Sequence, residues 1–333
     1  MISVFYCGRS HASLAFGVTP LGRRLPKVLV GIVLGTLLLA GGSPLRAEEK
    51  TSAPQELEIP RGLEPDIRFW EMIFSRFDPD HCVFHDRDDL RMVYLAKRIP
   101  KTSGAEDERS IRRYIGALRL AFWNLANGVS PQNLIEKRIF DVTPPARRNR
   151  ETFRMAMDNI RCQRGIDLTP SLHRSRSYIQ MVQKILSRKG LPSDLAYLPH
   201  LESGYNVRAH SRAGARGIWQ LMPATARLMG LKVNRHFDER TDAVRATHAA
   251  SELLQDLYRD TGDWPLAITA YNYGQNGMAR AVKLHGRDYL TVRTRHKSPL
   301  FGFAARNYYP SFLAVRNVAR AYEKMGDTKT AVR

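Results

Sequence analysis

Apolar residues recur at helical spacing through most of this 333-residue chain. The clearest run lies between residues 178 and 186, and a helix-stop signal, Gly190 and Pro192, follows it. The same spacing recurs over residues 111–125, 153–160 and 250–258. Asp263 is a good N-cap for a further helix that starts at Trp264, and Gly274 lies just past its expected end. No segment alternates apolar with polar residues as a half-buried strand would. The pattern therefore predicts a mainly α fold.

The length of the chain favours two folded units. Breaks rich in Pro and Gly fall at DVTPPARRNR (141–150) and GIDLTPS (165–171). We therefore expect a helical N-terminal domain over residues 63–171, with the stripe FWEMIFSRF in its core, and a second domain over residues 172–325.

The N-terminus has the order of an export signal. Residues 28–40 are an uncharged apolar run, which basic residues precede and the sequence LRA follows, ending at Ala47. This order is typical of a signal peptide that is cleaved near Ala47. A retained membrane anchor is the alternative, although the run is shorter than the roughly 20 residues that span a bilayer. We expect residues 1–47 to be the signal peptide and residues 48–62 to be a polar linker.

The chain is strongly basic, with 52 Lys and Arg against 32 Asp and Glu. Residues 1–47 hold five of the basic residues and no acidic one, so the remainder keeps a net charge of +15. An exported basic protein is expected to meet an anionic wall or membrane surface and not nucleic acid, but charge does not choose between the first two. The basic runs at 146–150 and 173–177 either bind wall carboxylates or are solvated surface.

Two cysteines, Cys82 and Cys162, lie outside the signal. In an oxidising compartment they can form a disulfide, and two buried free thiols are the alternative. The nearby His81, His85 and Asp86 offer metal ligands, but without further ligand residues at suitable spacing they favour a structural role. We expect no metal and no cofactor.

One carboxylate, Glu202, stands in the otherwise apolar or aromatic segment AYLPHLESGYN (196–206). Helical spacing places it on one face with Leu195 and Leu198, although Pro199 should kink the helix or start it afresh. Apolar surroundings disfavour the ionised carboxylate, so such a group can stay protonated near neutral pH and act as a general acid. A surface glutamate without a function is the alternative.

Three clusters rich in Tyr, Trp, Asn and Gln follow this segment: SRAGARGIWQLMPATA (211–226), AYNYGQNG (270–277) and RNYYP (306–310). These side chains stack on sugar rings and hydrogen-bond their hydroxyl and amide groups. Each cluster by itself is also compatible with packing and helix capping.

Taken in order, Glu-Ser at 202–203, S-x-x-G-A-x-G-I-W-Q-L-M-P-x-T-A at 211–226 and A-Y-N-x-G at 270–274 resemble the lytic murein transglycosylases of family 1. The segments LAYLPHLES and RNYYPSFLA are most similar to the branch of membrane-bound lytic transglycosylase D. The resemblance covers residues 172 to about 320. It implies a goose-lysozyme-like catalytic domain, preceded by a helical domain, that acts on peptidoglycan glycan strands in a Gram-negative periplasm.

The resemblance also implies roles for individual residues. Glu202 aligns with the single catalytic acid, and Ser211 aligns with a residue near the substrate N-acetyl group. The positions that align with the saccharide groove are Gln220, Met222, Tyr271 and Asn272. Tyr308 aligns with the aromatic residue of the family's terminal E-T-R-x-Y-V motif, whose acidic position is Ala304 here.

The spacing of acids bears on the mechanism, because glycosidases that use two carboxylates need the second one within reach of the first. Residues 203–237 contain no Asp or Glu, although Asp238 or Asp263 could fold back. The resemblance implies substrate assistance, in which Glu202 acts as acid and then as base to give a 1,6-anhydro sugar. The alternatives are a lysozyme-type hydrolase and a non-catalytic peptidoglycan-binding scaffold.

Overall fold

The computed structural model of the protein describes residue 57, residues 59–102 and residues 104–330, with side chains up to Met325. The expected signal peptide and most of the expected linker lie outside these residues. None of the helices in the described ranges is long and apolar enough to span a membrane.

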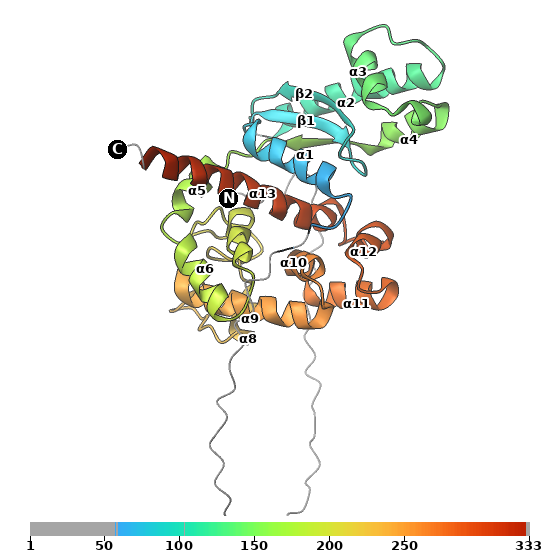
Figure 1. The fold of residues 1–333 in the computed structure, drawn as a ribbon. Helices are drawn as coiled ribbons and strands as arrows, with labels where there is room; N and C mark the ends of the chain where they lie inside the picture. The colour runs from blue at the N-terminus through green and yellow to red at the C-terminus, as the bar shows by residue number, and fades with distance from the viewer. Residues whose placement is uncertain (1–56, 58, 103, 331–333) are drawn as a thin grey trace, which may run out of the picture. The chain divides into compact units, whose positions relative to one another are not determined.

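The first part of the described chain combines helices with a small sheet (Figure 1). Its elements are α1 (Glu64–Ser75), β1 (His81–Asp86), β2 (Val93–Arg98), α2 (Ala105–Ala126), α3 (Leu134–Val142), η1 (Pro145–Arg147), α4 (Arg150–Asn159) and β3 (Ile160–Arg164).

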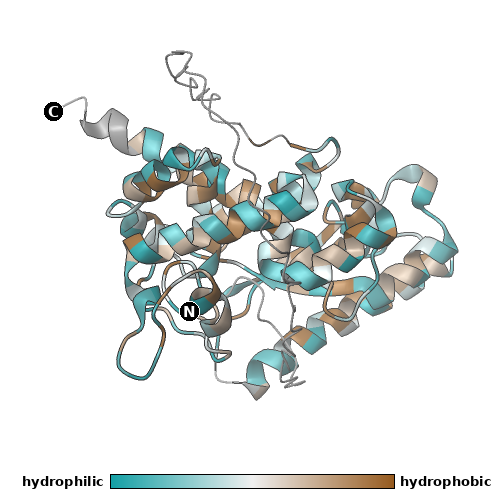
Figure 2. Ribbon diagram, turned by 90° about the horizontal axis from the view of Figure 1, so that it is seen from below, coloured by the Kyte–Doolittle hydropathy of each residue, from teal (hydrophilic) through white to brown (hydrophobic). Residues whose placement is uncertain are grey.

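The second part is helical. Its elements are α5 (Thr169–Ser175), α6 (Ile179–Arg188), η2 (Ser193–Tyr197), α7 (Leu198–Glu202), α8 (Pro223–Leu228), η3 (Glu239–Thr241), α9 (Ala243–Thr261), α10 (Trp264–Tyr273), α11 (Gln275–His285), α12 (Tyr289–Arg295) and α13 (Phe303–Thr330). The prediction of a mainly α fold is confirmed. The longer helices carry hydrophobic and hydrophilic residues along their length, as helices with one buried face do (Figure 2).

Strong local signals mark the helices that the sequence predicted best. Helix α10 starts at Trp264 because the side chain of Asp263 accepts a hydrogen bond from the backbone N–H of Leu266, at 3.3 Å. It ends at Gly274, whose positive φ of 94° suits glycine. Helix α6 likewise ends just before Gly190, where the sequence predicted its stop.

The three-stranded sheet was not predicted, and the expectation of helices alone in this part was wrong. The strands are antiparallel in the order β2-β1-β3, and residue 160, which the spacing assigned to a helix, begins β3. The reason lies in β1, which has an apolar core on each face. Val83 packs into a larger core with α1, whereas Cys82 and Phe84 pack into a smaller core with α2. A strand that is buried on both faces shows no alternation.

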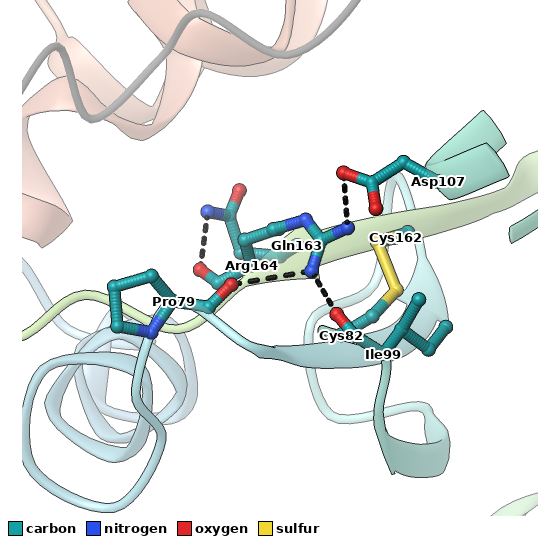
Figure 3. Close-up of a disulfide and its surroundings, with 7 residues drawn as sticks. All are labelled: Pro79, Cys82, Ile99, Asp107, Cys162, Gln163 and Arg164. Atoms are coloured by element: carbon teal, nitrogen blue, oxygen red, sulfur yellow. Dashed lines mark hydrogen bonds and ion pairs between the residues drawn. A yellow bond between two sulfur atoms is a disulfide. The ribbon is translucent and has the colours of Figure 1, made fainter. Parts of the chain in front are cut away.

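A disulfide joins Cys82 of β1 to Cys162 of β3, both buried in the smaller core (Figure 3). The sequence left this pairing open. Beside it the guanidinium of Arg164 donates to the carbonyl of Ile99 at 2.6 Å and to the carboxylate of Asp107 at 3.0 Å. The disulfide therefore ties two strands of the sheet together, and the ion pair of Arg164 with Asp107 holds the sheet against the start of α2.

The larger core continues from α1 into the helices after residue 166. Helix α1 packs along α13, which also contacts α10 and the η2–α7 segment. The buried stripe of α1, which includes Phe69, Trp70 and Ile73, was expected to be core and is core. The expected domain boundary at residues 171 and 172 stays a prediction, because α1 shares its core with the helices that follow it.

Candidate active site

Glu202 is the last residue of α7, a short helix that follows η2. Pro199 lies in the first turn of α7, so the chain starts a new helix there, one of the two outcomes expected from the proline. Leu195 and Leu198 are fully buried, as their shared face predicted. After Glu202 the chain turns sharply at Tyr205, which has a φ of 58°.

The carboxyl group of Glu202 has an unusual environment. The residue is partly exposed, yet protein atoms crowd its side chain. Burial raises its pKa from 4.5 to about 7, against the opposing effect of the Tyr308 hydroxyl, which donates a hydrogen bond to Oε1. Near neutral pH the group is therefore present in both its protonated and its ionised form, as a residue that both gives and takes a proton requires.

Two tyrosines lie close to this carboxyl group, and a tryptophan holds one of them in place. Burial raises the pKa of Tyr271 and of Tyr308, and the charge of Glu202 raises both further, so the three groups lie close together. The hydroxyl of Tyr271 donates to the backbone carbonyl of Trp219 at 2.7 Å. The indole N–H of Trp219 is anchored in turn by the hydroxyl of Thr247 at 2.9 Å. Segments more than 100 residues apart thus converge on Glu202.

The loop before Trp219 is folded tightly against the protein. The hydroxyl of Ser211 accepts the backbone N–H of Ala215 at 2.9 Å, and the backbones of the two residues also pair. At Gly217 a Cβ atom would lie 1.8 Å from the carbonyl oxygen of Arg240, so only glycine fits this approach. The serine that was expected near a substrate N-acetyl group therefore also holds the loop closed.

Gln220 adopts a left-handed backbone conformation with a φ of 48°, which is uncommon for a residue other than glycine. Its amide nitrogen donates to the carbonyls of Gly217 at 2.9 Å and Ala209 at 3.3 Å. Within the described residues its Oε1 accepts no hydrogen bond, so this oxygen is the polar atom that Gln220 can offer to a ligand. Met222 and Asn272 are exposed.

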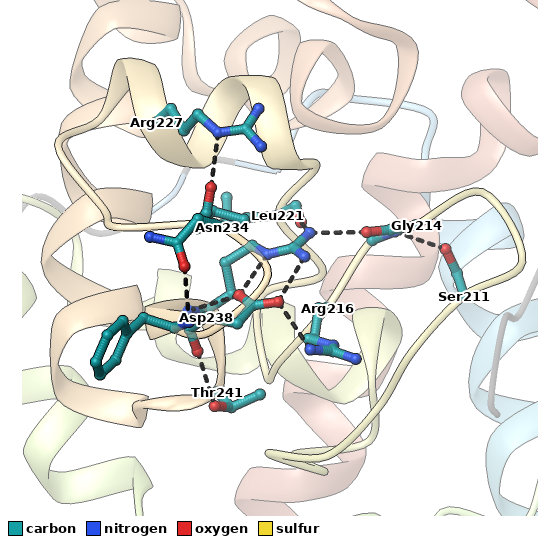
Figure 4. A network of polar contacts seen from close by, with 12 residues as sticks. Ser211, Gly214, Arg216, Leu221, Arg227, Asn234, Asp238 and Thr241 are labelled. Carbon is teal, nitrogen blue, oxygen red and sulfur yellow. Dashed lines mark hydrogen bonds and ion pairs between the residues drawn. The ribbon is translucent and has the colours of Figure 1, made fainter.

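The two acids that might have reached Glu202 are both engaged elsewhere, and Figure 4 shows the contacts of one of them, Asp238. Asp238 accepts hydrogen bonds from Arg240 and from Arg216, each at 2.8 Å, and the bond from Arg240 is the main reason why its pKa is lowered. Asp263 caps α10. Burial and Tyr308 account for the pKa of Glu202, so a second carboxylate does not contribute to it among the described residues.

A buried ion pair that was not predicted from the sequence joins η2, which leads into the helix of Glu202, to α13, which carries Tyr308. Asp194 of η2 is buried and pairs with Arg316 of α13 at 2.9 Å and with Arg320. The sequence contains one indication of this ion pair, because Arg316 is a lone cation in the apolar segment SFLAVRNVA. Its partner was not evident, since Asp194 lies 122 residues away.

The remaining polar residues singled out in the sequence do not form one ligand set. Nδ1 of His81 pairs with Asp78 at 2.7 Å, whereas His85 is fully buried with its Nδ1 2.7 Å from the carbonyl of Asp86. One residue of the basic run at 146–150 forms an ion pair within the protein, since Arg147 pairs with Asp89 at 2.9 Å.

Comparison with known proteins gives a consistent result. Residues 180–289 match the family model of the transglycosylase SLT domain. The chain is 33% identical over 159 residues to "Membrane-bound lytic murein transglycosylase D" of two Escherichia coli strains, which is 46% of this chain and 34% of the relative. It is 31% identical over 129 residues to "Membrane-bound lytic murein transglycosylase F" of Yersinia enterocolitica, covering 35% of this chain and 25% of that relative.

The chain thus spans about a third of the length of the first two relatives. The matched segment contains Glu202, Trp219 and Tyr271, and Tyr308 follows it. Residues 180–289 of this protein therefore match the transglycosylase SLT domain, and the chain is similar to proteins named as membrane-bound lytic murein transglycosylases.

Proposed function

We propose that this protein is a peptidoglycan lytic transglycosylase that cleaves the β-1,4 bond between N-acetylmuramic acid and N-acetylglucosamine. The observation that carries the proposal is the state of Glu202. A lone carboxyl group has a pKa near 7, accepts a hydrogen bond from Tyr308 and lies inside an SLT domain. A group in this state can protonate a leaving oxygen and then take up a proton within one catalytic cycle.

In the proposed reaction, Glu202 first protonates the glycosidic oxygen as the C1–O bond breaks. The N-acetyl oxygen of the muramoyl residue attacks C1 and takes the place that a second carboxylate has in other glycosidases. The resulting Glu202 carboxylate then removes the proton of the sugar's own 6-hydroxyl. That oxygen attacks C1, expels the N-acetyl oxygen and closes the 1,6-anhydro ring, so Glu202 ends the cycle protonated.

The surrounding residues fit supporting roles in this scheme. Tyr308 stabilises the carboxylate that forms after the first proton transfer, since its hydrogen bond favours the ionised form. Gln220 presents Oε1, and Asn272 and Met222 present exposed side chains, for contacts with the glycan. We assign Ser211 to the neighbourhood of the N-acetyl group on the basis of the family motif, with its hydroxyl shared with the loop.

We further propose that the protein is exported to the periplasm, where the glycan strands are its partner. The N-terminal segment would direct export and, if it is retained, would attach the protein to the membrane. The excess of basic residues suits an anionic wall.

The decisive test is product analysis by mass spectrometry after digestion of purified sacculi. The proposed reaction yields muropeptides that end in 1,6-anhydro-N-acetylmuramic acid and are lighter by one water than hydrolysis products. Hydrolysed ends would assign the lysozyme-type reaction instead. Binding to sacculi without any cleavage would support the non-catalytic scaffold.

Glu202→Gln is the matched variant, because the amide keeps the size of the side chain and an oxygen that accepts the Tyr308 hydroxyl. It should bind sacculi as the wild type does and release no product. If Glu202→Gln digested sacculi at the wild-type rate, the proposed mechanism would be wrong.

A further inference from the structure

A cavity of about 460 Å³ lies where the loop after α12, the start of α13 and the turn between β1 and β2 meet. Its residues include Arg87 and Asp88 from the turn, Lys297 from the loop and Arg306 from α13. The volume falls in the range of pockets that bind small ligands. None of these residues belongs to the group around Glu202.

The cavity is positively charged. Arg87, Lys297 and Arg306 contribute three cations against the carboxylate of Asp88, which leaves two positive charges in excess. Although burial opposes it, hydrogen bonds from Arg87 and Arg306 hold the pKa of Asp88 below its usual range, so this carboxylate is ionised. A cavity with this balance favours an anionic ligand.

Hydrogen bonds within the protein do not engage all the N–H donors of the cavity. Asp88 receives one N–H from Arg306 at 3.0 Å and one from Arg87 at 3.4 Å, and Arg87 also donates to Oδ1 of Asn159 at 2.9 Å, although each guanidinium carries five N–H groups. Lys297 is exposed and forms no ion pair within the described part of the chain. Asp88, with Asn159, thus holds the two guanidinium groups in place, while the ammonium group of Lys297 is left for a ligand.

The inner wall supports the same conclusion. His296 lines the cavity and is only 6% exposed, with Nε2 3.1 Å from the hydroxyl of Tyr273 and with Nδ1 lacking a partner in the described protein. Phe301 packs on the histidine ring at a centroid distance of 5.1 Å. A rigid, partly apolar floor beneath cationic groups is a common arrangement in sites that bind organic anions.

The cavity and the candidate active site share helix α13, and α10 contacts one residue of the cavity wall. Arg306 precedes Tyr308 on α13 by two residues, about 3 Å along the helix axis. Tyr273, which contacts His296, follows Tyr271 on α10 by two residues. Helix α13 therefore directs one side chain to Glu202 and another to the cavity, whereas α10 carries one side chain close to Glu202 and another that contacts His296.

We propose that this cavity binds a carboxylate of the peptide stems that project from the glycan strand. The inference rests on the proposed function, because a strand bound at Glu202 brings its stems to the same region of the protein. A stem of four residues extends about 13 Å, slightly more than the diameter of about 10 to 12 Å of a helix with its side chains. Lys297 is the residue that contacts the carboxylate, and Asp88 positions the two arginines.

The test compares two substrates: peptidoglycan with intact stems, and the same glycan strands after an amidase has removed the stems. Lys297→Gln should lower kcat/KM about fivefold on the first substrate, the effect of losing one partly exposed charge contact, and should leave the second unchanged. Lys184→Gln, an exposed lysine of α6, is the matched control and should change neither. Sedimentation of the Glu202→Gln variant with each substrate repeats the comparison for binding alone.

An equal effect of Lys297→Gln on both substrates, or no effect on either, overturns the inference. The inference is also overturned if Lys297→Gln loses binding to anionic phospholipid vesicles while its effect on activity does not depend on the stems. That result would assign the cavity to lipid phosphate. A failure of the proposed function would give a different experimental result. In that case the wild type releases no anhydro product from either substrate, while sedimentation still shows whether binding depends on the stems and on Lys297.

Discussion

Glu202→Gln should make the protein more stable, and by an amount that grows with pH. The folded protein raises the pKa of Glu202 from 4.5 to about 7. A tenfold change in an acid dissociation constant corresponds to about 1.4 kcal/mol, so ionised Glu202 destabilises the fold by at most about 3 kcal/mol. An amide at this position avoids that cost and still accepts the hydrogen bond of Tyr308.

The sign follows from proton binding. Below about pH 4.5 the group is protonated in both the folded and the unfolded chain, so it does not affect the balance. Between about pH 4.5 and pH 7 the unfolded chain releases the proton while the folded chain keeps it, and the free energy of unfolding falls as pH rises. Above about pH 7 the free energy of unfolding has fallen by its full amount. The glutamine variant lacks this dependence.

The assay is urea denaturation of both proteins at intervals between about pH 5 and pH 8. The difference in unfolding free energy should grow by about 2 kcal/mol over that range, in favour of the variant. Glu106→Gln, at an exposed position in the first turn of α2, is the control and should show no comparable trend. A difference that is constant with pH, or that favours the wild type at high pH, would refute the raised pKa and the acid–base role built on it.

Three further substitutions test the surroundings of the site and the fold. Tyr308→Phe removes the hydrogen bond that favours ionised Glu202, so the alkaline limb of the pH–rate profile should move up by about one pH unit; a downward move would contradict this. Replacing Cys82 and Cys162 together by serine should lower the free energy of unfolding by about 4 kcal/mol for a disulfide that spans 80 residues, measured by denaturation under oxidising conditions. Asp194→Asn leaves a buried guanidinium on α13 without its carboxylate and should cost about 3 to 5 kcal/mol, with a lower melting temperature; an unchanged melting temperature would show that the pair does not hold α13.

The parts of the protein that could be predicted from the sequence depend on neighbours in the chain. Helix α10 was located from its N-cap at Asp263 and its stop at Gly274, both of which act within one turn. Glu202 stood out because its neighbours in the sequence are apolar, and the buried Leu195 and Leu198 are among the groups that enclose its helix.

The parts that could not be predicted depend on distant segments. Strand β1 shows no alternation because α1 covers one of its faces and α2 the other, and neither cover is visible in the sequence of the strand. The pairing of Asp194 with Arg316 and the junction of Asp88 with Arg306 join residues 122 and 218 positions apart. A sequence displays each member of such a pair but not the partner.

The substitution at Ala304 bears on how Glu202 acquires its properties. In the family motif this position is acidic, and it precedes Tyr308 by four residues, so the two side chains share a face of α13. A carboxylate there would lie on the side that faces Glu202, and its charge would raise the pKa of Glu202. In this protein burial alone raises that pKa to about 7, against the hydrogen bond from Tyr308. An acid at position 304 is therefore not needed to keep Glu202 protonated, and the balance between burial and one tyrosine hydroxyl sets its acid–base behaviour.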